Sequence, residues 1–347
     1  MNVKINNVYR FILPVITAIV IFCNINLSAQ NKDMQYSVSE SKILMGTIVK
    51  TTVRNSNVNL IKRALKAAYK EMQRVEDLLS SHKKGSEISH INFFAGIRPV
   101  KVSFETLTII KNSLYYSKKS KGLFDVSIGS LSNLWGFSDD NRVIELPDSA
   151  EVDSTLRYVG YRNIIINHSD TTVFLKDKNM QLDLGGIAKG YAIDRGSAKL
   201  KSFGVINFIL NAGGDIYVSG RKDKNKKWTI GIKDPRNTSK IIVVFNLENY
   251  AVATSGDYER FRIINGVRYH HILNPYDGYP GRLSESCTVL APTAEEADAL
   301  ATYFFLLGPQ KALKNKSLNI PFLIISTKGK IYYNSLFKSK FNPKTLE

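Results

Sequence analysis

Apolar residues recur every three to four positions between residues 61 and 79, and charged residues fill most of the positions between them. This period is typical of an amphipathic α-helix that places one face against a protein core. The helix is predicted to end at Ser80 and Ser81, before a polar stretch that runs to Asn92 and is expected to be a loop. Weaker patterns predict helices over residues 106–118, 147–161, 191–201 and 294–308. The residues that define the first helix are Ile61, Leu65, Ala68, Met72, Val75 and Leu79.

Short β-branched and apolar runs, separated by Gly, Asn and Asp turns, predict strands over residues 43–49, 163–167 and several segments between 172 and 249. A further apolar run is predicted as a strand that would bury Asp125. Residues 322–325 and 330–333 are predicted to form a hairpin with Gly329 in its turn. Because no sustained βαβ alternation occurs, the predicted fold class is α+β, a single mixed α/β domain over residues 30–347.

Residues 1–29 have the form of a secretory signal peptide. Lys4 and Arg10 precede an apolar run over residues 11–22, and Leu-Ser-Ala ends at Ala29, the expected cleavage site. An uncleaved membrane anchor is the alternative, although the run is short for a membrane span. Lipid attachment at Cys23 is disfavoured because the bulky Phe22 precedes it. We therefore expect an exported, periplasmic protein, and association with the inner membrane is compatible with this expectation.

The chain has 347 residues, of which 44% are hydrophobic and 22% charged, and its net charge is +18. No nucleic-acid-binding module is recognisable, and export argues against a nucleic-acid partner. A solvated basic surface that faces anionic lipid or an acidic partner is the simpler interpretation. After signal cleavage, Cys287 would be the only cysteine, which excludes an intramolecular disulfide.

The segment DLGGIAKGYAIDR, residues 183–195, combines a strand end, a glycine turn and a predicted helix start. This arrangement directs backbone N–H groups and the positive end of a helix dipole at one point, where an anion can bind. Lys189 would add a positive charge, although the spacing is not that of a P-loop. An isolated glycine pair is more often a plain turn. Two further glycine turns with neighbouring Asp residues, in LNAGGD and ATSGD, favour the phosphate-binding interpretation.

Asp298 and Thr302 are four residues apart on the predicted helix 294–308 and therefore share one face. A carboxylate and a hydroxyl are hard oxygen donors that suit Mg²⁺ better than zinc. Taken alone, each residue is better explained as a solvated or packing side chain. His270, His271 and Cys287 lack zinc-site spacing. Together with the glycine turns, the pair predicts Mg²⁺-assisted handling of a pyrophosphate. Asp125 is a candidate ligand contact, because a buried carboxylate is costly unless it is hydrogen-bonded.

The ordered set of motifs MGT, DVSIGSLSNLWGF, DLGGIAKGYAIDR, NAGGDIYVSG, ATSGDYERF, HHILNPYDGYP and ADALAT resembles that of the FAD:protein FMN transferases, the ApbE family. The resemblance covers nearly all of the chain after residue 29. It implies an extracytoplasmic, Mg²⁺-dependent enzyme that transfers FMN from FAD to a Thr or Ser hydroxyl of a partner protein and releases AMP. The implied acceptor is typically a subunit of a membrane redox complex.

The resemblance also implies roles for individual residues. His82 stands where the family has a flavin-contacting residue, often Tyr. Asn274 and Asp277 stand where the family commonly has Asp and Thr, and Asp277 is expected to add a charge beside the pyrophosphate. The metal would be held by Asp298, Thr302 and the backbone around Gly186, with Ala301 alongside. FAD would contact Met45, Phe124, Asp125, Val126, Asp183, Lys189 and Ile272.

Lys189 and the metal would neutralise charge that develops on the pyrophosphate. The acceptor hydroxyl needs a base, and His271 is the first candidate because imidazole titrates near neutral pH; Asp257 is the second. His271 could instead orient FAD without taking a proton. Two other functions remain open. One is an FAD pyrophosphatase that uses water as acceptor and gives FMN and AMP. The other is a non-catalytic FAD-binding protein, which the Asp298/Thr302 pair disfavours.

Overall fold

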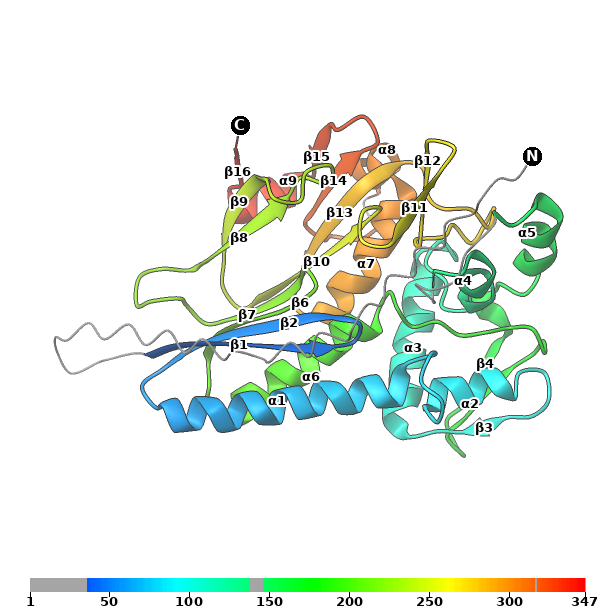
Figure 1. The fold of residues 1–347 in the computed structure, drawn as a ribbon, viewed down its shortest axis with the longest axis horizontal. Coiled ribbons are helices and arrows are strands. Elements are labelled where there is room, and N and C mark those ends of the chain that lie inside the picture. Colours follow the sequence, from blue (N-terminus) through cyan, green and yellow to red (C-terminus); the bar gives the residue numbers. More distant parts are fainter. Residues whose placement is uncertain (1–35, 138–145, 316, 347) are drawn as a thin grey trace, which may run out of the picture.

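An antiparallel sheet of eight strands lies at the centre of the fold (Figure 1), in the order β1-β2-β6-β7-β10-β13-β14-β15. The computed structural model describes residues 36–137, 146–315 and 317–346, so the predicted signal peptide lies outside the described residues. The strands are β1 (Tyr36–Leu44), β2 (Thr47–Asn55), β6 (Asn207–Ala212), β7 (Asp215–Ser219), β10 (Tyr250–Gly256), β13 (Ser284–Ala291), β14 (Phe322–Ser326) and β15 (Ile331–Tyr333).

Three helices cover one face of this sheet: α1 (Val58–Leu79), α6 (Ala188–Ser202) and α7 (Ala294–Leu307). Side chains alternate between the faces of a strand, and β10 shows this clearly. Ala251 and Ala253 belong to the core under the helices, whereas Val252 belongs to a separate core on the other face. That second core is closed by α9 (Ser335–Phe341) and a small sheet of β8 (Trp228–Lys233), β9 (Ile241–Leu247) and β16 (Lys344–Thr345).

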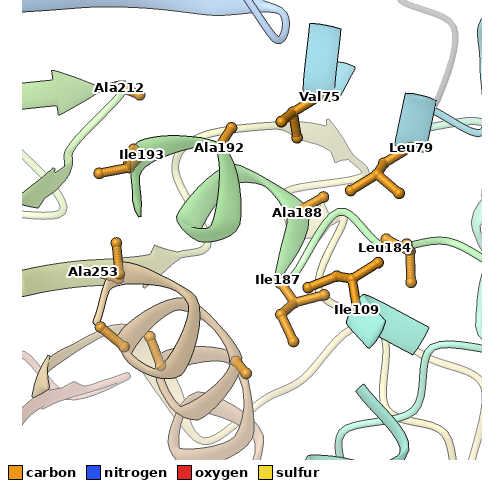
Figure 2. Packing of buried hydrophobic residues seen from close by; sticks show 14 of the residues in the cluster. Val75, Leu79, Ile109, Leu184, Ile187, Ala188, Ala192, Ile193, Ala212 and Ala253 are labelled. Carbon is orange, nitrogen blue, oxygen red and sulfur yellow. The ribbon is translucent and has the colours of Figure 1, made fainter. Parts of the chain in front are cut away.

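Helix α6 is packed between α1 and α7 at very short range. Figure 2 shows Val75 and Leu79 of α1 near Ala188 and Ala192 of α6. A Cβ atom at Gly190 would lie 2.2 Å from the carbonyl oxygen of Ala294, so only glycine permits this crossing of α6 and α7.

Each of these two helices also caps the other. Asp194 of α6 accepts hydrogen bonds from the N–H groups of Ala294 and Glu295, at 2.8 and 2.9 Å. Asp298 of α7 accepts one from Gly190 N–H at 2.9 Å. The two helix starts are therefore locked together.

The remaining elements form a second, mostly helical part beside one end of the sheet, with a small three-stranded sheet in the order β3-β5-β4 (Figure 1). Trp135 is the centre of a small core there, with Phe137, Val152 and Leu273 around it. These elements are α2 (Glu87–Phe93), β3 (Val100–Lys101), α3 (Phe104–Lys119), α4 (Gly129–Trp135), α5 (Ser149–Leu156), the 3₁₀ helix η1 (Tyr161–Asn163), β4 (Ile164–Asn167) and β5 (Thr172–Leu175). Two further elements lie later in the chain, the hairpin β11 (Phe261–Ile264) and β12 (Val267–His270), and the short helix α8 (Pro309–Lys314).

The α+β prediction of a mixed domain is confirmed, as are the first helix, the helix at 294–308 and the 322–333 hairpin. Helix α1 begins where the side chain of Asn57 accepts a hydrogen bond from Leu60 N–H. Residues 36–137, 146–315 and 317–346 contain no helix that is both long and apolar enough to cross a membrane.

Three predicted elements are wrong. Residues 43–49 do not form one strand, because Met45 and Gly46 adopt positive φ angles and turn β1 into β2. Asp125 lies in a turn between α3 and α4 rather than in a strand. The polar stretch before Asn92 contains helix α2, which the side chain of Ser86 caps by accepting a hydrogen bond from Ser89 N–H.

Candidate functional site

Two adjoining pockets form one continuous cleft beside the first turn of α6. Their linings share Asp183, Gly185, Lys189, Glu259 and Arg260. The first pocket is walled by the turn after α3, the glycine turn before α6, the segment after β10, the segment after β12, and α7. The second pocket extends from the glycine turn to the β1–β2 turn and the end of α1.

Most of the residues predicted from the sequence line this cleft. Met45 and His82 line the second pocket, and Asp183 and Lys189 line both. Asp257 and Ala301 line neither of the two. The predicted residues that line the first pocket alone are Phe124, Asp125, Val126, Gly186, His271, Ile272, Asp298 and Thr302.

Lys189 is one of the cations that line the cleft, and its ammonium group is paired with a carboxylate that was not predicted as part of the site. Nζ of Lys189 lies 2.8 Å from Oδ2 of Asp215, whose side chain is only 2% exposed. Burial lowers the pKa of Lys189, but neighbouring carboxylates outweigh burial and raise the pKa above its ordinary value. These carboxylates belong to Asp215, Asp298 and Glu259. Lys189 is therefore a fixed positive charge between acidic groups.

The second carboxylate oxygen of Asp215 is also bound: Oδ1 accepts a hydrogen bond from Thr254 N–H at 3.0 Å, which fixes the side chain. Asp215 begins β7 directly after the glycine turn of the β6–β7 hairpin, at Gly213 and Gly214. The recurrence of Asp beside each glycine turn was the signal that could have found it.

Asp298 and Thr302 both face the first pocket from successive turns of α7, as their spacing predicts. The hydroxyl oxygen of Thr302 is 3.2 Å from that of Ser255. A Cβ at Gly186 would lie 3.2 Å from the same Thr302 oxygen, so the glycine backbone lies directly against this hydroxyl. The glycine turn, Asp298 and Thr302 thus bring hard oxygen donors together on one wall.

The start of α6 does not offer its free N–H groups to a ligand as the sequence analysis expected. Gly190 N–H donates to Asp298, and Gly185 N–H donates to Oδ1 of Asp183 at 2.8 Å. The protein's own carboxylates thus occupy two donors of the predicted anion site. The positive charge that remains for an anionic ligand comes from side chains, chiefly Lys189 and Arg260, which line both pockets.

Asp298 is the most strongly perturbed carboxyl group lining the cleft. Burial, reinforced by the negative charge of Asp215, raises its pKa to about 8, although Lys189 and the Gly190 N–H oppose the shift. A neighbouring cation would favour its ionised form. The site therefore has an excess of negative charge that a divalent cation could balance. The described residues contain no group of three or more His, Cys, Asp or Glu side chains that could hold a metal by themselves.

Asp125 lines the first pocket, but its carboxylate is satisfied by the protein. Oδ1 accepts hydrogen bonds from the N–H and hydroxyl of Ser127, and Oδ2 accepts one from Tyr161 N–H at 2.8 Å. These bonds tie the turn after α3 to the start of η1. Asp125 consequently shapes the pocket wall, and its burial needs no ligand to explain it.

His271 lines the first pocket at the point where the chain returns from β12. Its Nδ1 lies 3.3 Å from the carbonyl oxygen of Arg260. A carbonyl can only accept, so Nδ1 carries the proton and Nε2 has a free lone pair. Burial, followed by the charge of Arg260, holds the pKa of His271 well below its usual range. The neutral imidazole is thus the dominant form. His270 instead donates from Nε2 to Gly281 and supports the backbone.

The structure corrects the assignment of Asp257 as a second base. Its two carboxylate oxygens accept hydrogen bonds from Arg236 at 2.7 and 2.8 Å, and the same guanidinium contacts Glu285 at 3.0 Å. Asp257 is 5% exposed and faces away from the cleft, which its chain neighbours Gly256 and Glu259 line. Its carboxylate is therefore part of a clamp behind the cleft wall.

Two other expectations are also corrected. Ala301 is fully buried in α7, where its methyl group packs in the core. Asn274 and Asp277 do not line either pocket, and Nδ2 of Asn274 donates to Oδ2 of Asp277 at 2.8 Å within their own turn. The charge of Asp277 therefore does not face the cleft. Pro275, between them in the chain, does line it.

In the second pocket, the β1–β2 turn is fixed by α1. Met45 has a φ of 53°, a backbone conformation that residues other than glycine rarely adopt. Its N–H donates to Oε2 of Glu76 at 2.8 Å. His82, just beyond α1, is exposed and lines the same pocket. The sequence analysis missed Glu76, Glu259 and Arg260, although the last two lie in the quoted motif ATSGDYERF.

Comparisons with known proteins agree on one family. The sequence profile described as "ApbE family" matches residues 45–321. A Treponema pallidum protein named FAD:protein FMN transferase is 32% identical over 288 residues, which are 79% of this chain and 80% of that protein. A Haemophilus influenzae protein of the same name is 33% identical over 264 residues, 74% of this chain and 76% of that protein.

Solved structures give the same result. The crystal structure of the ApbE protein from Thermotoga maritima superposes with a TM-score of 0.82 at 34% identity, and the match covers 87% of this chain and 98% of that one. The flavin transferase ApbE from Vibrio cholerae superposes with a TM-score of 0.78 at 30% identity, and the match covers 88% and 99% of the two chains.

Proposed function

This chain belongs to the ApbE family and is an enzyme of the FAD:protein FMN transferase class, and on that premise we propose that it uses Mg²⁺, transfers FMN to a Thr or Ser hydroxyl of a partner protein, and releases AMP. The observation that carries this proposal is the composition of one cleft wall. Lys189, Asp298, Thr302 and His271 line the same pocket, although they come from three separate parts of the chain.

The two pockets suit two neighbouring parts of FAD, the pyrophosphate and the flavin ring. We place the pyrophosphate in the first pocket, beside Lys189, and the flavin ring towards Met45 and His82 in the second. Lys189 is suited to this role because neighbouring carboxylates raise its pKa and keep it charged at physiological pH.

The residues of the first pocket fit a bound Mg²⁺. Asp298 and Thr302 supply a carboxylate and a hydroxyl oxygen, the backbone at Gly186 lies against Thr302, and phosphate oxygens of FAD would complete the set. Burial and the nearby Asp215 raise the pKa of Asp298, and a bound cation would favour its ionised form. When bound, Mg²⁺ would neutralise negative charge on the pyrophosphate.

His271 is the residue we assign to the acceptor side. Its Nε2 would take the proton of the acceptor hydroxyl as the hydroxyl oxygen forms a bond to the phosphorus of the FMN half. The bond from that phosphorus to the bridging oxygen breaks, and the electron pair leaves with AMP. Lys189 stabilises the negative charge that builds on the phosphoanhydride oxygens during this step. The low pKa of His271 keeps it in the base form.

An FAD pyrophosphatase would use the same residues with water as the acceptor, so hydrolysis is the second candidate function. The exposure of the cleft at the glycine turn is compatible with either acceptor. A flavin carrier without chemistry is disfavoured by the Lys189–Asp215–Asp298 charge cluster, since binding alone does not require it.

The test is incubation of the protein with FAD, Mg²⁺ and a flavin-free acceptor domain from a membrane redox protein. Covalent flavin fluorescence on the acceptor in a denaturing gel, with AMP in equal amount, supports transfer. Free FMN and AMP with an unlabelled acceptor support the pyrophosphatase. FAD that binds and remains intact supports the carrier.

We further propose that the chain acts outside the cytoplasm, because residues 1–29 have the pattern of a signal peptide. N-terminal sequencing of the exported protein should give a start near Gln30. Retention of residues 11–22 would favour an anchored form.

A further inference from the structure

The hairpin β11–β12 projects directly from the wall of the cleft. The chain leaves the cleft at Arg260, forms the hairpin, and re-enters the cleft at His271. The two ends are joined at its root, where His271 N–H donates to the Arg260 carbonyl at 3.1 Å. Whatever binds this hairpin is therefore placed beside the candidate base.

The two faces of the hairpin are in different environments. On one face, Tyr269 stacks on Trp135 at a ring distance of 5.6 Å, and its cross-strand partner Arg262 lies over Phe137. On the other face, Phe261 and Ile263 are 38% and 61% exposed. The inner face is thus anchored on the small core around Trp135, and the outer face is an apolar surface open to solvent.

The strand edges of this hairpin are also open. In the part of the chain that the structure describes, β11 and β12 pair only with each other. An extended segment of another protein could add to such an edge through main-chain hydrogen bonds.

The hairpin is surrounded by positive charge that lacks carboxylate partners. Arg260, Arg268 and Arg282 form no ion pair with any residue in the described ranges. On the outer face, Arg268 is stacked 3.8 Å above the Phe261 ring. Arg282 lies 4.9 Å from the centre of the Tyr269 ring, at the border of the inner face. Stacking orients these guanidinium groups, and oriented arginines are typical of surfaces that bind carboxylates. The partner that complements this surface is acidic.

From these observations we infer that the outer face of β11–β12 is the docking surface for the acceptor protein, and that it binds an extended acceptor segment with apolar and acidic residues next to the target hydroxyl. The inference rests on the proposed function. It assigns to the hairpin the selection of the acceptor and its delivery to His271, while FAD binding is left to the cleft.

Ile263 allows a test that spares the cleft, because its side chain is exposed and lines none of the pockets described above. Ile263→Glu removes apolar area and adds a repulsive charge, whereas Ile263→Lys removes the same area and adds an attractive one. Ile206→Glu is the matched control, since Ile206 is 62% exposed and precedes β6 on another part of the surface. The readouts are the acceptor KM with the flavin-free acceptor domain, the rate of FAD hydrolysis without acceptor, and the FAD Kd.

Ile263→Glu is expected to raise the acceptor KM about tenfold, Ile263→Lys by less, and Ile206→Glu not at all. FAD Kd and acceptor-free hydrolysis should match the wild type in every variant. The acceptor KM of the wild type should also rise with salt, because screening weakens charge pairing.

Equal acceptor KM values for Ile263→Glu and Ile206→Glu would overturn the docking surface while leaving the proposed function standing, provided that the wild type labels the acceptor. A wild type that hydrolyses FAD but labels no acceptor would overturn both. Loss of binding to anionic lipid vesicles by Ile263→Glu, with an unchanged acceptor KM, would assign the surface to membrane contact instead. If Ile263→Glu fails to fold, Ile263→Ser, which removes the same exposed apolar area without adding a charge, replaces it and should raise the acceptor KM.

Discussion

The ammonium group of Lys189 lies 2.8 Å from the buried carboxylate of Asp215, so this cation is oriented by the sheet and not by the helix that carries it. The pair fixes one charge at the cleft surface before any ligand binds. Its negative member is 2% exposed and is itself held by Thr254.

Lys189→Met should slow FAD hydrolysis and FMN transfer by the same factor, about 10²–10³, which is the usual effect of removing one preorganised donor to developing charge. Both reactions share the breaking phosphoanhydride, so the loss cannot depend on the acceptor. Steady-state rates with and without acceptor measure it. Lys199→Met, towards the other end of α6, is the control and should retain full activity. A loss of transfer without a loss of hydrolysis would show that Lys189 does not act on the pyrophosphate.

His271→Ala should lower FMN transfer about 10²–10⁴-fold, the usual contribution of a positioned proton acceptor. FAD affinity should change much less, because the imidazole acts on the incoming hydroxyl. Since the pKa of His271 is held well below its usual range, wild-type transfer at saturating Mg²⁺ should keep its rate as the pH falls through 6.5. The measurement pairs transfer rate with FAD Kd over a pH series. If both fall in proportion, His271 orients FAD and another group takes the proton.

Mg²⁺ affinity of the FAD-free protein should rise about tenfold per pH unit up to about pH 8 and be constant above it, because Asp298 must lose its proton to bind the cation. Titration calorimetry between pH 6 and 9 should detect about one proton released per ion below this pH. Asp298→Asn should abolish both the binding and the Mg²⁺ dependence of FAD turnover. Affinity that is independent of pH in the wild type would place the cation on other residues.

Arg236→Gln should destabilise the protein by about 2 kcal/mol, between the values for exposed and fully buried ion pairs, because the arginine side chain is 40% exposed and Asp257 is buried. Asp257 and Glu285 would then be two buried carboxylates without a cation. The segment from Thr254 to Arg260 lines the cleft, so FAD Kd should rise as well. Thermal unfolding and FAD titration measure the two effects. Arg236→Lys keeps the positive charge but cannot donate two parallel hydrogen bonds to Asp257, so it should recover part of the stability and part of the FAD affinity.

Gly190→Ala should destabilise the fold by about 1–3 kcal/mol, the range for overpacked cores. The added Cβ would lie 2.2 Å from a backbone oxygen of Ala294, and neither helix can yield without breaking the Asp194 and Asp298 caps. Gly160→Ala is the control, since its Cβ would meet nothing closer than 3.5 Å. Denaturant unfolding measures the free energy of unfolding of both variants and of the wild type. Equal stability would show that α6 and α7 can separate freely.

Sequence reasoning succeeded where a local pattern carries the information. The spacing of apolar residues in α1 is set by the helix period, and Asp298 and Thr302 share a face for the same reason. It failed at the β1–β2 turn, where apolar residues on both sides of Met45 and Gly46 were read as one strand although both residues have positive φ. Gly46 is a turn signal, but the contact that holds Met45 in this conformation comes from Glu76, in a different element.

The sequence also could not predict which charged side chains pair with each other in the folded protein. Asp257 and Asp215 both follow glycine turns, yet one is clamped by Arg236 behind the wall and the other contacts Lys189 in the cleft. Which of the two faces the cleft depends on the pairing of β7 and β10 in the sheet. Spacing along the chain contains no information about that pairing.

The strand order has a consequence for how the enzyme acquires its substrate. β2 pairs with β6, and α1 packs on α6, so the first quarter of the chain has no stable partner until the middle has been synthesised. Thr302, which faces Gly186, comes later still. Such long-range closure is slow, and the cleft requires nearly the whole fold to be complete. Because FAD would bind only this completed cleft, it stabilises the native state by mass action, and added FAD should raise the thermal midpoint of a variant weakened in α1 as well as that of the wild type.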